Sequence, residues 1–380
     1  MNQIRPAKII FAGGGTGGHL FPAIAIANRI EEMLKNSGGS DILFVGTKRG
    51  IEFRMKDKLG YPLHLINMRG IVRSLTLKNL LVPFVIVTAL LKSFFLIRRF
   101  KPDVVVGTGG YVSWPVLKMA NWKKISTVLQ EQNSFPGITT RQLAGKAACV
   151  YLGFGKAKEF LTTNTEIKIT GNPVRRTISN GNREEAFKEY GLNNSKKTIL
   201  ILGGSQGARA INEAVLAGLE KINESDKYQL LWQTGKGDYK EVTALAGRKV
   251  QDCTLFPFAH NIEQVYAAAD LAIARAGALT LAELIECNIP AILIPYRFAA
   301  GDHQRKNAED MAATGLSEII EEDNLKNLNL IEEAINLIES DRFDSMKNKL
   351  REETKNKKPA VDVIAEDIIK IINKTRKNEN

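Results

Sequence analysis

The stretch that decides the fold reads Ala12-Gly13-Gly14-Gly15-Thr16-Gly17-Gly18-His19-Leu20-Phe21-Pro22. The apolar run 8–12 precedes it, and the run 23–34, with helical spacing, follows it. This order predicts a strand, a glycine turn and a helix. Five glycines within 13–18 let backbone N–H groups approach an anionic group closely, and the helix N-terminus adds partial positive charge. Doubly wound sheets bind their ligands at such a crevice.

His19 is the only titratable side chain in this turn. It is a candidate for proton transfer, because histidine titrates near neutrality and this one follows a ligand-type turn. Two simpler interpretations stay open at this point. The glycines can serve a tight turn that needs their dihedral angles, and His19 can cap or orient the loop.

Length and composition bound the class of protein. A chain of 380 residues favours two domains of a globular type. The net charge of +12 suggests an anionic partner, namely nucleic acid, anionic lipid or a phosphorylated substrate. The three cysteines form no CxxC pair, so neither a zinc site nor a disulfide framework is indicated, which fits a reducing cytosol. No signal peptide is expected before the first strand.

The first half continues as a doubly wound pattern. Runs 41–46, 61–66, 103–107, 126–131, 149–153 and 167–170 are predicted strands. A dinucleotide-binding fold would place an acid at the end of the second strand to hold a ribose, but Lys48 and Arg49 stand there. This departure argues against a nicotinamide cofactor at the first loop. A second glycine turn covers 108–113, and Glu131 and Asn133 follow a strand end, where such folds place ligand contacts.

Residues 80–97 form an almost wholly apolar run with basic flanks. Its length approaches a membrane span of about 20 residues, but Pro83 and Lys92 interrupt it. One interpretation is a buried crossover helix. The other is a helix whose exposed apolar face, ringed by Lys and Arg, lies on an anionic membrane without crossing it. The predicted patch comprises Arg69, Arg73, Lys78, Leu80, Leu81 and Phe84.

The pattern restarts in the second half. A strand over 197–203 leads into a glycine turn at 203–209 and a helix, which echoes the first half. We therefore expect two Rossmann-like domains, 1–171 and 172–357, with a C-terminal helix within 358–380 that returns to the first domain. Candidate ligand-binding residues are most concentrated in 274–309. Glu283 suits a pair of sugar hydroxyls, and the side-chain amide of Gln304 can both donate and accept hydrogen bonds. Simpler roles remain, with Glu283 as a helix-dipole partner and Asp302 as an N-cap.

Several motifs, taken together and in order, resemble the MurG family of peptidoglycan N-acetylglucosaminyltransferases. They are Gly-Gly-Thr-Gly-Gly-His at 14–19, Gly-Gly-Tyr-Val-Ser at 109–113, Glu-Gln-Asn at 131–133, Gly-Asn-Pro-Val-Arg at 171–175, Gly-Gly-Ser-Gln-Gly-Ala-Arg at 203–209, Gly-Ala-Leu-Thr-Leu-Ala-Glu at 277–283 and Asp-His-Gln-Arg-Lys-Asn-Ala at 302–308. The resemblance implies an α/β fold of the GT-B type, with parallel sheets facing across a cleft. It implies inverting transfer of N-acetylglucosamine from UDP-GlcNAc to the 4-hydroxyl of the muramyl-pentapeptide of undecaprenyl-pyrophosphate (lipid I), giving lipid II.

The resemblance also implies a donor-binding set. Asn133 and Gln304 would contact the sugar, with His303 able to share the latter role. The backbone near Ala259, or alternatively Ile262, would meet the uracil, and Glu283 the ribose. The first loop and the groups near the diphosphate complete the set: Thr16, Gly17, Gly18, Arg175, Ser205, Ala278, Leu279 and Thr280.

An inverting transfer needs a base for the acceptor hydroxyl and groups that hold the leaving diphosphate. His19 is the first candidate base, and Glu131 is the alternative. No acidic cluster suggests a metal, so we assign no cofactor. The expected location is peripheral, on the cytoplasmic side of the inner membrane. Other cell-wall synthesis or division proteins are further candidate partners.

Three other functions use similar features. A UDP-GlcNAc 2-epimerase shares the architecture but needs no membrane face, and a nicotinamide oxidoreductase lacks its ribose acid here. A nucleic-acid-binding module would need a contiguous basic face with stacking aromatics, whereas the Lys and Arg residues are spread along the chain.

Overall fold

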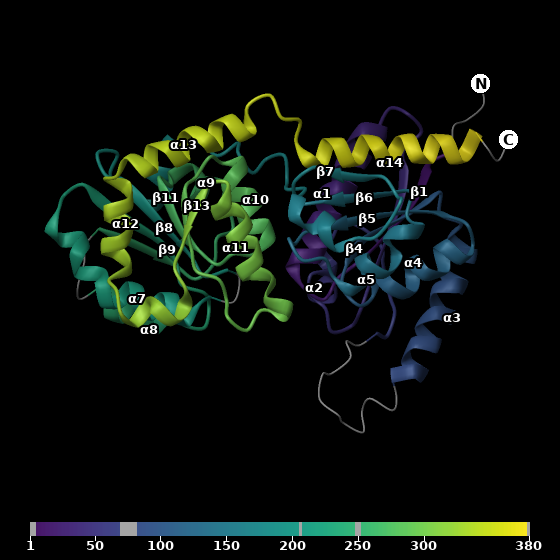
Figure 1. Ribbon diagram of the computed structural model, residues 1–380, viewed down its shortest axis with the longest axis horizontal. Helices are drawn as coiled ribbons and strands as arrows, with labels where there is room; N and C mark the ends of the chain where they lie inside the picture. Colours follow the sequence, from purple (N-terminus) through teal and green to yellow (C-terminus); the bar gives the residue numbers. More distant parts are fainter. Residues whose placement is uncertain (1–4, 69–81, 205–206, 248–251, 378–380) are drawn as a thin grey trace. The chain divides into compact units, whose positions relative to one another are not determined.

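A computed structural model describes residues 5–68, 82–204, 207–247 and 252–377. The chain divides into two compact units. Unit 1 comprises Met1–Val174 with Lys358–Asn380, and unit 2 comprises Arg175–Lys357. Both are built from parallel strands that alternate with helices, so the predicted α/β class with two parallel sheets is confirmed (Figure 1).

The sheet of unit 1 has seven strands in the order β3-β2-β1-β4-β5-β6-β7, all paired in parallel. Its inner strands are continuous apolar runs because both faces are covered. Strand order reverses between β1 and β4, the place where doubly wound sheets bind ligands. The bounds are β1 Ala7–Gly13, β2 Ser40–Gly46, β3 Leu63–Leu65, β4 Val104–Gly109, β5 Ser126–Glu131, β6 Cys149–Leu152 and β7 Ile167–Ile169.

Helices cover both faces of this sheet. Ile26 and Ile30 of α1 share one buried cluster with Ile364 and Ile368 of α14. Helices α3 and α4 supply the cluster on the opposite face. The bounds are α1 Gly17–Leu34, α2 Ile51–Arg54, α3 Val82–Phe100, α4 Ser113–Trp122, α5 Ile138–Leu143 and α14 Ala360–Lys377.

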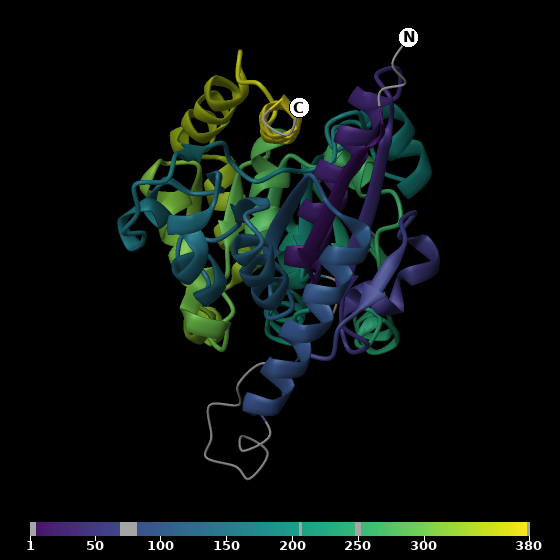
Figure 2. The same cartoon turned by 90° about the vertical axis from the view of Figure 1, so that its right-hand side faces the viewer.

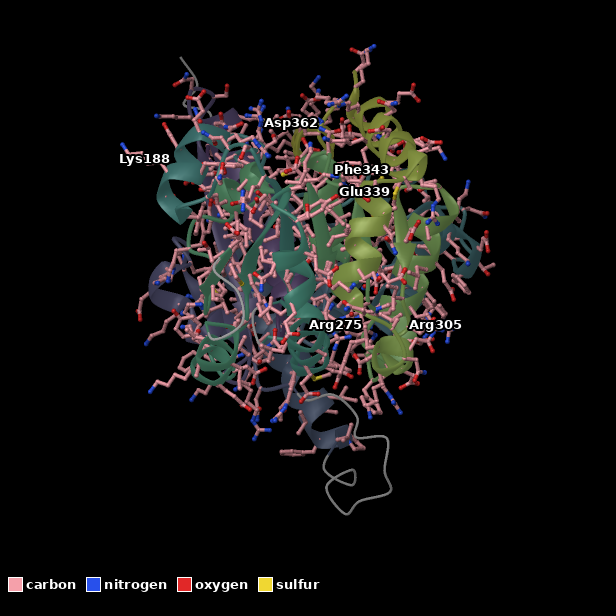
Figure 3. All side chains as sticks on the ribbon, turned by 90° about the vertical axis from the view of Figure 1, so that its left-hand side faces the viewer. Lys188, Arg275, Arg305, Glu339, Phe343 and Asp362 are labelled. Atoms are coloured by element: carbon pink, nitrogen blue, oxygen red, sulfur yellow. The ribbon has the colours of Figure 1, made fainter. Side chains whose placement is uncertain are left out.

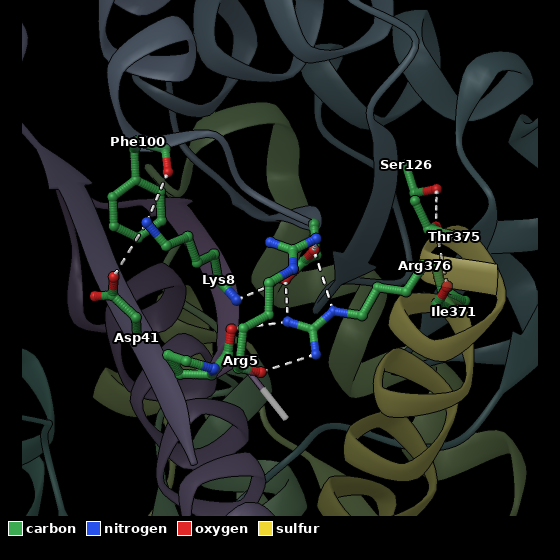
Figure 4. A network of polar contacts seen from close by, with 10 residues as sticks. Arg5, Lys8, Asp41, Phe100, Ser126, Ile371, Thr375 and Arg376 are labelled. Carbon is green, nitrogen blue, oxygen red and sulfur yellow. Dashed lines mark hydrogen bonds and ion pairs between the residues drawn. The ribbon is translucent and has the colours of Figure 1, made fainter. Parts of the chain in front are cut away.

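The C-terminal helix α14 is tied to unit 1 by a buried carboxylate. Asp103 accepts hydrogen bonds from the Arg5 guanidinium (2.8 Å), the Arg376 guanidinium (2.8 Å) and the Lys8 backbone N–H (2.8 Å). Arg376 also donates to the backbone oxygens of Arg5 and Pro6 (Figure 4). Two further pairs, Arg29–Asp362 and Lys168–Asp367, hold the earlier turns of α14.

Asp103→Ala is expected to destabilise unit 1 by about 3–5 kcal/mol, because two cationic groups and a backbone N–H lose a buried partner. Amide hydrogen exchange along α14 should accelerate strongly. The matched control is Glu366→Gln, an exposed ion-pair partner on the same helix, which should leave the stability of unit 1 close to that of the wild type. Equal exchange rates in the two variants would contradict this account of how α14 is held.

The sheet of unit 2 has six parallel strands in the order β10-β9-β8-β11-β12-β13. Their bounds are β8 Lys197–Leu202, β9 Tyr228–Gln233, β10 Cys253–Phe256, β11 Leu271–Ala274, β12 Ala291–Leu293 and β13 Ser317–Ile319. The sequence predicts strands over 229–233, 254–256, 271–274 and 291–294, which correspond to β9 to β12, but not β13, whose residues Ser-Glu-Ile form no apolar run. One face carries a core of Ile199, Ile201 and Trp232 with helices α7, α8 and α12. The helices are α6 Arg183–Tyr190, α7 Arg209–Gly218, α8 Tyr239–Ala246, α9 Ile262–Ala268, α10 Ala278–Glu286, α11 His303–Ala313, α12 Leu330–Ile338 and α13 Asp341–Thr354.

Candidate active site

The glycine turn of unit 1 connects β1 to α1 at the sheet's carboxyl edge. Helix α1 begins at Gly17, ahead of the expected start at residue 23, so Gly17, Gly18 and His19 belong to its first turn. Leu20 and Pro22, which follow in the same helix, are both buried. Thr16 is the N-cap residue and is exposed.

The His19 ring is held on two sides. Its Nδ1 lies 3.2 Å from the Gly14 carbonyl oxygen and 3.2 Å from the Thr16 hydroxyl. The opposite edge of the ring lies against Gly109, where φ is +101° and an added Cβ would sit 2.7 Å from the ring. The Thr108 hydroxyl donates to the main-chain oxygen of His19 (2.8 Å). The turns after β1 and β4 therefore orient the imidazole together.

Glu131, the alternative base of the sequence analysis, is buried at the end of β5. One of its carboxylate oxygens accepts from the Gly137 N–H (2.9 Å) and the Thr140 hydroxyl (2.7 Å). The other accepts from the backbone N–H (3.2 Å) and the side-chain amide (3.3 Å) of Asn133. Both oxygens thus shape the loop 132–140, and Glu131 orients Asn133, the predicted sugar contact.

In unit 2, the predicted phosphate contacts Ala278, Leu279 and Thr280 form the first turn of α10. Gly277, the residue before α10, has no side chain with which to cap the helix, and the helix N-terminus carries a partial positive charge. Further along α10, Glu283 accepts a hydrogen bond from the Tyr266 hydroxyl (2.8 Å). Burial raises the pKa of Glu283, while the Tyr266 hydrogen bond and the charge of Arg175 act in the opposite direction.

The remaining predicted donor contacts lie on loops of unit 2, and the side chain of Gln233 joins two of these loops. Its side chain accepts from the Ala259 N–H (2.9 Å) and donates to the Gly204 carbonyl oxygen (3.0 Å). Gln304 accepts from the Tyr296 N–H (3.0 Å), and the ring nitrogen Nδ1 of His303 lies 2.6 Å from the Ala300 carbonyl oxygen. Ser205 lies outside the described residues.

Arg275 supports the segment that carries Gln304. Its guanidinium pairs with Glu322, donates to the Ile294 carbonyl oxygen (3.1 Å) and lies over the Tyr296 ring. Figure 3 labels Arg275 together with Arg305, which pairs with acidic residues of its own helix and of the segment after β13. The segment after β12 is therefore held in place from both sides.

The site predictions thus gather at the carboxyl edge of each sheet. Sequence reasoning missed four supporting residues: Glu52, Gln233, Tyr266 and Arg275. Gln233 carried a usable signal, because it is a polar residue that ends an apolar strand. Within the described part of the chain, no three His, Cys, Asp or Glu side chains group closely enough to hold a metal ion.

Helix α3 presents an apolar stripe to solvent. Phe84 (70% exposed), Val87 (52%), Leu91 (53%) and Phe95 (62%) recur at helical spacing, while Ala89, Ser93 and Ile97 are buried. The helix is thus both the crossover helix and the exposed apolar face that the sequence analysis weighed. Its amino-terminal turns extend beyond the rest of unit 1 (Figure 2). Among the described helices, none has the length and apolar character to span a bilayer.

Basic and aromatic side chains border this stripe. Lys92, Arg98 and Arg99 are exposed on α3. Trp122 is exposed beside Phe94, and the Lys123 ammonium lies 4.8 Å from the centre of the Phe94 ring. The predicted patch residues Arg69, Arg73, Lys78, Leu80 and Leu81 lie outside the described residues.

Comparison with known proteins places the chain. The glycosyltransferase family 28 N-terminal domain matches residues 9–152, and the C-terminal domain of the same family matches residues 198–366. A relative from Chlorobaculum parvum is 40% identical over 351 residues, covering 91% of this chain and 94% of the relative. It is named UDP-N-acetylglucosamine--N-acetylmuramyl-(pentapeptide) pyrophosphoryl-undecaprenol N-acetylglucosamine transferase. A relative from Carboxydothermus hydrogenoformans with the same name is 41% identical, covering 82% of this chain and 84% of the relative.

Two solved structures share the fold of this chain. The crystal structure of Acinetobacter baumannii MurG is 27% identical, with a TM-score of 0.75, and covers 96% of this chain and 100% of that one. A UDP-GlcNAc 2-epimerase from Neisseria meningitidis shares the fold at 13% identity and a TM-score of 0.64, covering 98% of this chain and 100% of that one. On the near-complete match at 40% identity, together with both domain models, this chain belongs to the MurG family within glycosyltransferase family 28.

Proposed function

We propose that this protein transfers N-acetylglucosamine from UDP-GlcNAc to the 4-hydroxyl of the muramyl sugar of lipid I, giving lipid II for peptidoglycan synthesis. One observation carries the proposal: relatives named for this transfer match both units of the chain at about 40% identity. The named substrates also fit the chemistry of the two sheet edges, one with a histidine in a glycine loop and the other with a helix N-terminus and a glutamate.

Unit 2 holds the donor in this proposal. The N-terminus of α10 and Arg175 neutralise the diphosphate, so the proposal assigns no metal ion. Glu283 accepts the ribose hydroxyls, the backbone at Ala259 meets the uracil, and Gln304 contacts the sugar. The resemblance to the MurG family also assigns Thr16, Gly17 and Gly18 of the first loop to donor binding.

His19 is the base. Nε2 takes the proton of the acceptor hydroxyl, whose oxygen attacks the anomeric carbon of N-acetylglucosamine. The bond from that carbon to the diphosphate oxygen breaks, and UDP leaves with the electron pair. A single displacement of this kind inverts the anomeric centre. Proton transfer by a positioned side chain contributes about 10²–10⁴-fold in rate.

The acceptor carries a polyprenyl chain, so the enzyme has to work at a membrane surface. We propose that the α3 stripe enters the interface of the cytoplasmic leaflet, while Lys92, Arg98, Arg99 and Lys123 meet anionic headgroups. Trp122 suits the same boundary, because its ring is apolar with a polar N–H. The enzyme is then a peripheral protein of the inner membrane, where other cell-wall synthesis and division proteins are candidate partners.

The double variant Leu91→Glu/Phe95→Glu is expected to weaken binding to vesicles containing anionic lipid by about tenfold or more, because two exposed apolar side chains no longer enter the interface. Sedimentation with vesicles measures the effect, and added salt should weaken wild-type binding as well. The control is Leu245→Glu, an exposed leucine on α8 of unit 2. Vesicle binding that is as strong in the double variant as in the control would remove α3 from the membrane contact.

The direct test supplies labelled UDP-GlcNAc and a short-chain lipid I analogue to the purified protein. The expected product is the lipid-linked disaccharide, with release of UDP. Conversion of UDP-GlcNAc without acceptor would instead indicate an epimerase, whose fold this chain shares. Absence of disaccharide under conditions where the donor binds would defeat the proposal.

A further inference from the structure

Glu52 lies on the short helix α2, directly beneath the glycine turn that carries His19. It is completely buried. Its carboxylate accepts hydrogen bonds from the backbone N–H groups of Gly15 (2.8 Å) and Thr47 (2.7 Å), and the Thr47 hydroxyl lies 3.3 Å away. These donors belong to the loop after β1 and the loop after β2. Glu52 therefore links the two loops at the carboxyl edge of the sheet.

The space for this carboxylate is made by glycines. A Cβ atom at Gly14, Gly46 or Gly50 would overlap the Glu52 side chain. The three glycines come from three segments: the turn after β1, the end of β2 and the residue before α2. Burying a carboxylate is costly unless its hydrogen bonds are satisfied. The Glu52 carboxylate therefore stays where the surrounding loops provide its hydrogen-bond donors.

One peptide group connects Glu52 to His19. The N–H of Gly15 and the carbonyl of Gly14 belong to the same peptide bond. The N–H donates to Glu52, and the carbonyl oxygen lies 3.2 Å from Nδ1 of the His19 ring. Gly15 has a φ of +89°, a conformation that favours glycine and orients this peptide.

We propose that Glu52 is a positioning residue that acts on His19 through the Gly14–Gly15 peptide. Accepting the Gly15 N–H polarises the peptide, so the Gly14 carbonyl oxygen becomes a stronger acceptor. The Thr16 hydroxyl, also 3.2 Å from Nδ1, can donate to an unprotonated ring nitrogen, but the Gly14 oxygen has no proton to donate, so a hydrogen bond between it and the ring requires the proton on Nδ1. Nε2 then keeps its lone pair for the acceptor hydroxyl.

The arrangement has a chemical parallel in serine-protease triads, where a carboxylate bonded directly to Nδ1 selects the tautomer and stabilises the imidazolium. Here the peptide transmits the effect, so it should be smaller. The inference rests on the proposed role of His19 as the base. It adds a residue that touches neither substrate.

The tautomer of His19 tests the inference without any assay of transfer. Long-range ¹H–¹⁵N correlation on protein labelled at histidine reports which ring nitrogen carries the proton, and a His19→Gln variant assigns the signals among the four histidines. We expect the neutral ring to carry its proton on Nδ1 in the wild type. A neutral ring protonated mainly on Nε2 would overturn the proposal.

The Glu52→Gln variant tests the consequence. We expect kcat to fall about ten- to a hundredfold with the donor KM little changed, and the Nε2-protonated form of His19 to increase. Asp103→Asn is the matched control, since it is another buried carboxylate of unit 1 that accepts a backbone N–H, but at the amino end of β4. It should lower stability and leave kcat and the tautomer unchanged. A kcat that is unchanged in Glu52→Gln, or that falls equally in the two variants, would overturn the proposal.

A second variant covers the case in which Glu52→Gln does not fold. Gly15→Ala adds a Cβ that meets no atom of the described residues within 4 Å, so in the free protein it acts by disfavouring the positive φ that orients the shared peptide. It should show the same loss of kcat and the same tautomer change, and a normal kcat would count against the relay. Wild-type protein without transferase activity would defeat the proposed function, whereas the tautomer measurement would still decide the role of Glu52.

Discussion

His19→Ala is expected to lower kcat about a hundredfold or more, while the KM for UDP-GlcNAc changes little. The imidazole is the group that takes the acceptor proton, and the donor is held chiefly by unit 2 in the proposed function. The variant therefore loses an interaction made in the transition state rather than one made with the bound donor. Steady-state assays with a short-chain lipid I analogue measure both constants, and donor affinity is checked separately by calorimetry.

The matched control for this variant is His64→Ala. His64 is the histidine of strand β3 and takes no part in the proposed chemistry. It should retain wild-type kcat in detergent-solubilised substrate. Full activity of His19→Ala would transfer the role of base to another group, with Glu131 the next residue to replace.

Glu283→Gln is expected to weaken UDP-GlcNAc binding about ten- to a hundredfold, with kcat at saturating donor affected much less. Hydrogen bonds to a charged group contribute about 1.5–3 kcal/mol, and the carboxylate would accept from the ribose hydroxyls. Glutamine keeps an oxygen that can accept from the Tyr266 hydroxyl, so the local packing is retained. Calorimetric titration with UDP-GlcNAc gives the dissociation constant directly.

Glu286→Gln, on the last turn of the same helix, is the control for Glu283 and should bind the donor normally. Replacing Glu283 by alanine should be at least as damaging as glutamine, because it also leaves the Tyr266 hydroxyl without this partner. Normal donor affinity in both Glu283 variants would exclude the ribose role.

Donor affinity should also depend on pH through Glu283. Burial raises the pKa of this carboxyl, although the Tyr266 hydrogen bond and the Arg175 charge partly oppose the rise. A protonated carboxyl accepts hydrogen bonds less well. Binding should therefore weaken as pH falls through the raised pKa, at a higher pH than an ordinary glutamate would give. The dependence should be absent in Glu283→Gln.

Much of the architecture follows from local properties of the sequence. Apolar runs such as 103–107 and 197–203 are long enough to predict strands buried on both faces, and the glycine turns after them mark the ligand edge. The same reasoning predicts His19 and Glu283 as site residues at these edges. It failed for β13, where a three-residue strand at the edge of the sheet carries no periodicity to detect.

The sequence by itself thus determined the class of fold and the two sheet edges that carry glycine turns. It also determined which residues at those edges are able to bind a ligand or transfer a proton. The tertiary structure alone decided how these residues are held. Hydrogen bonds join Glu52 to Gly15, Tyr266 to Glu283, and Gln233 to Ala259. The residues of each pair are far apart in the sequence, so no local pattern encodes these bonds. The physical reason is that strand and turn propensities act between near neighbours, whereas a hydrogen bond between distant segments depends on the packing of the whole sheet.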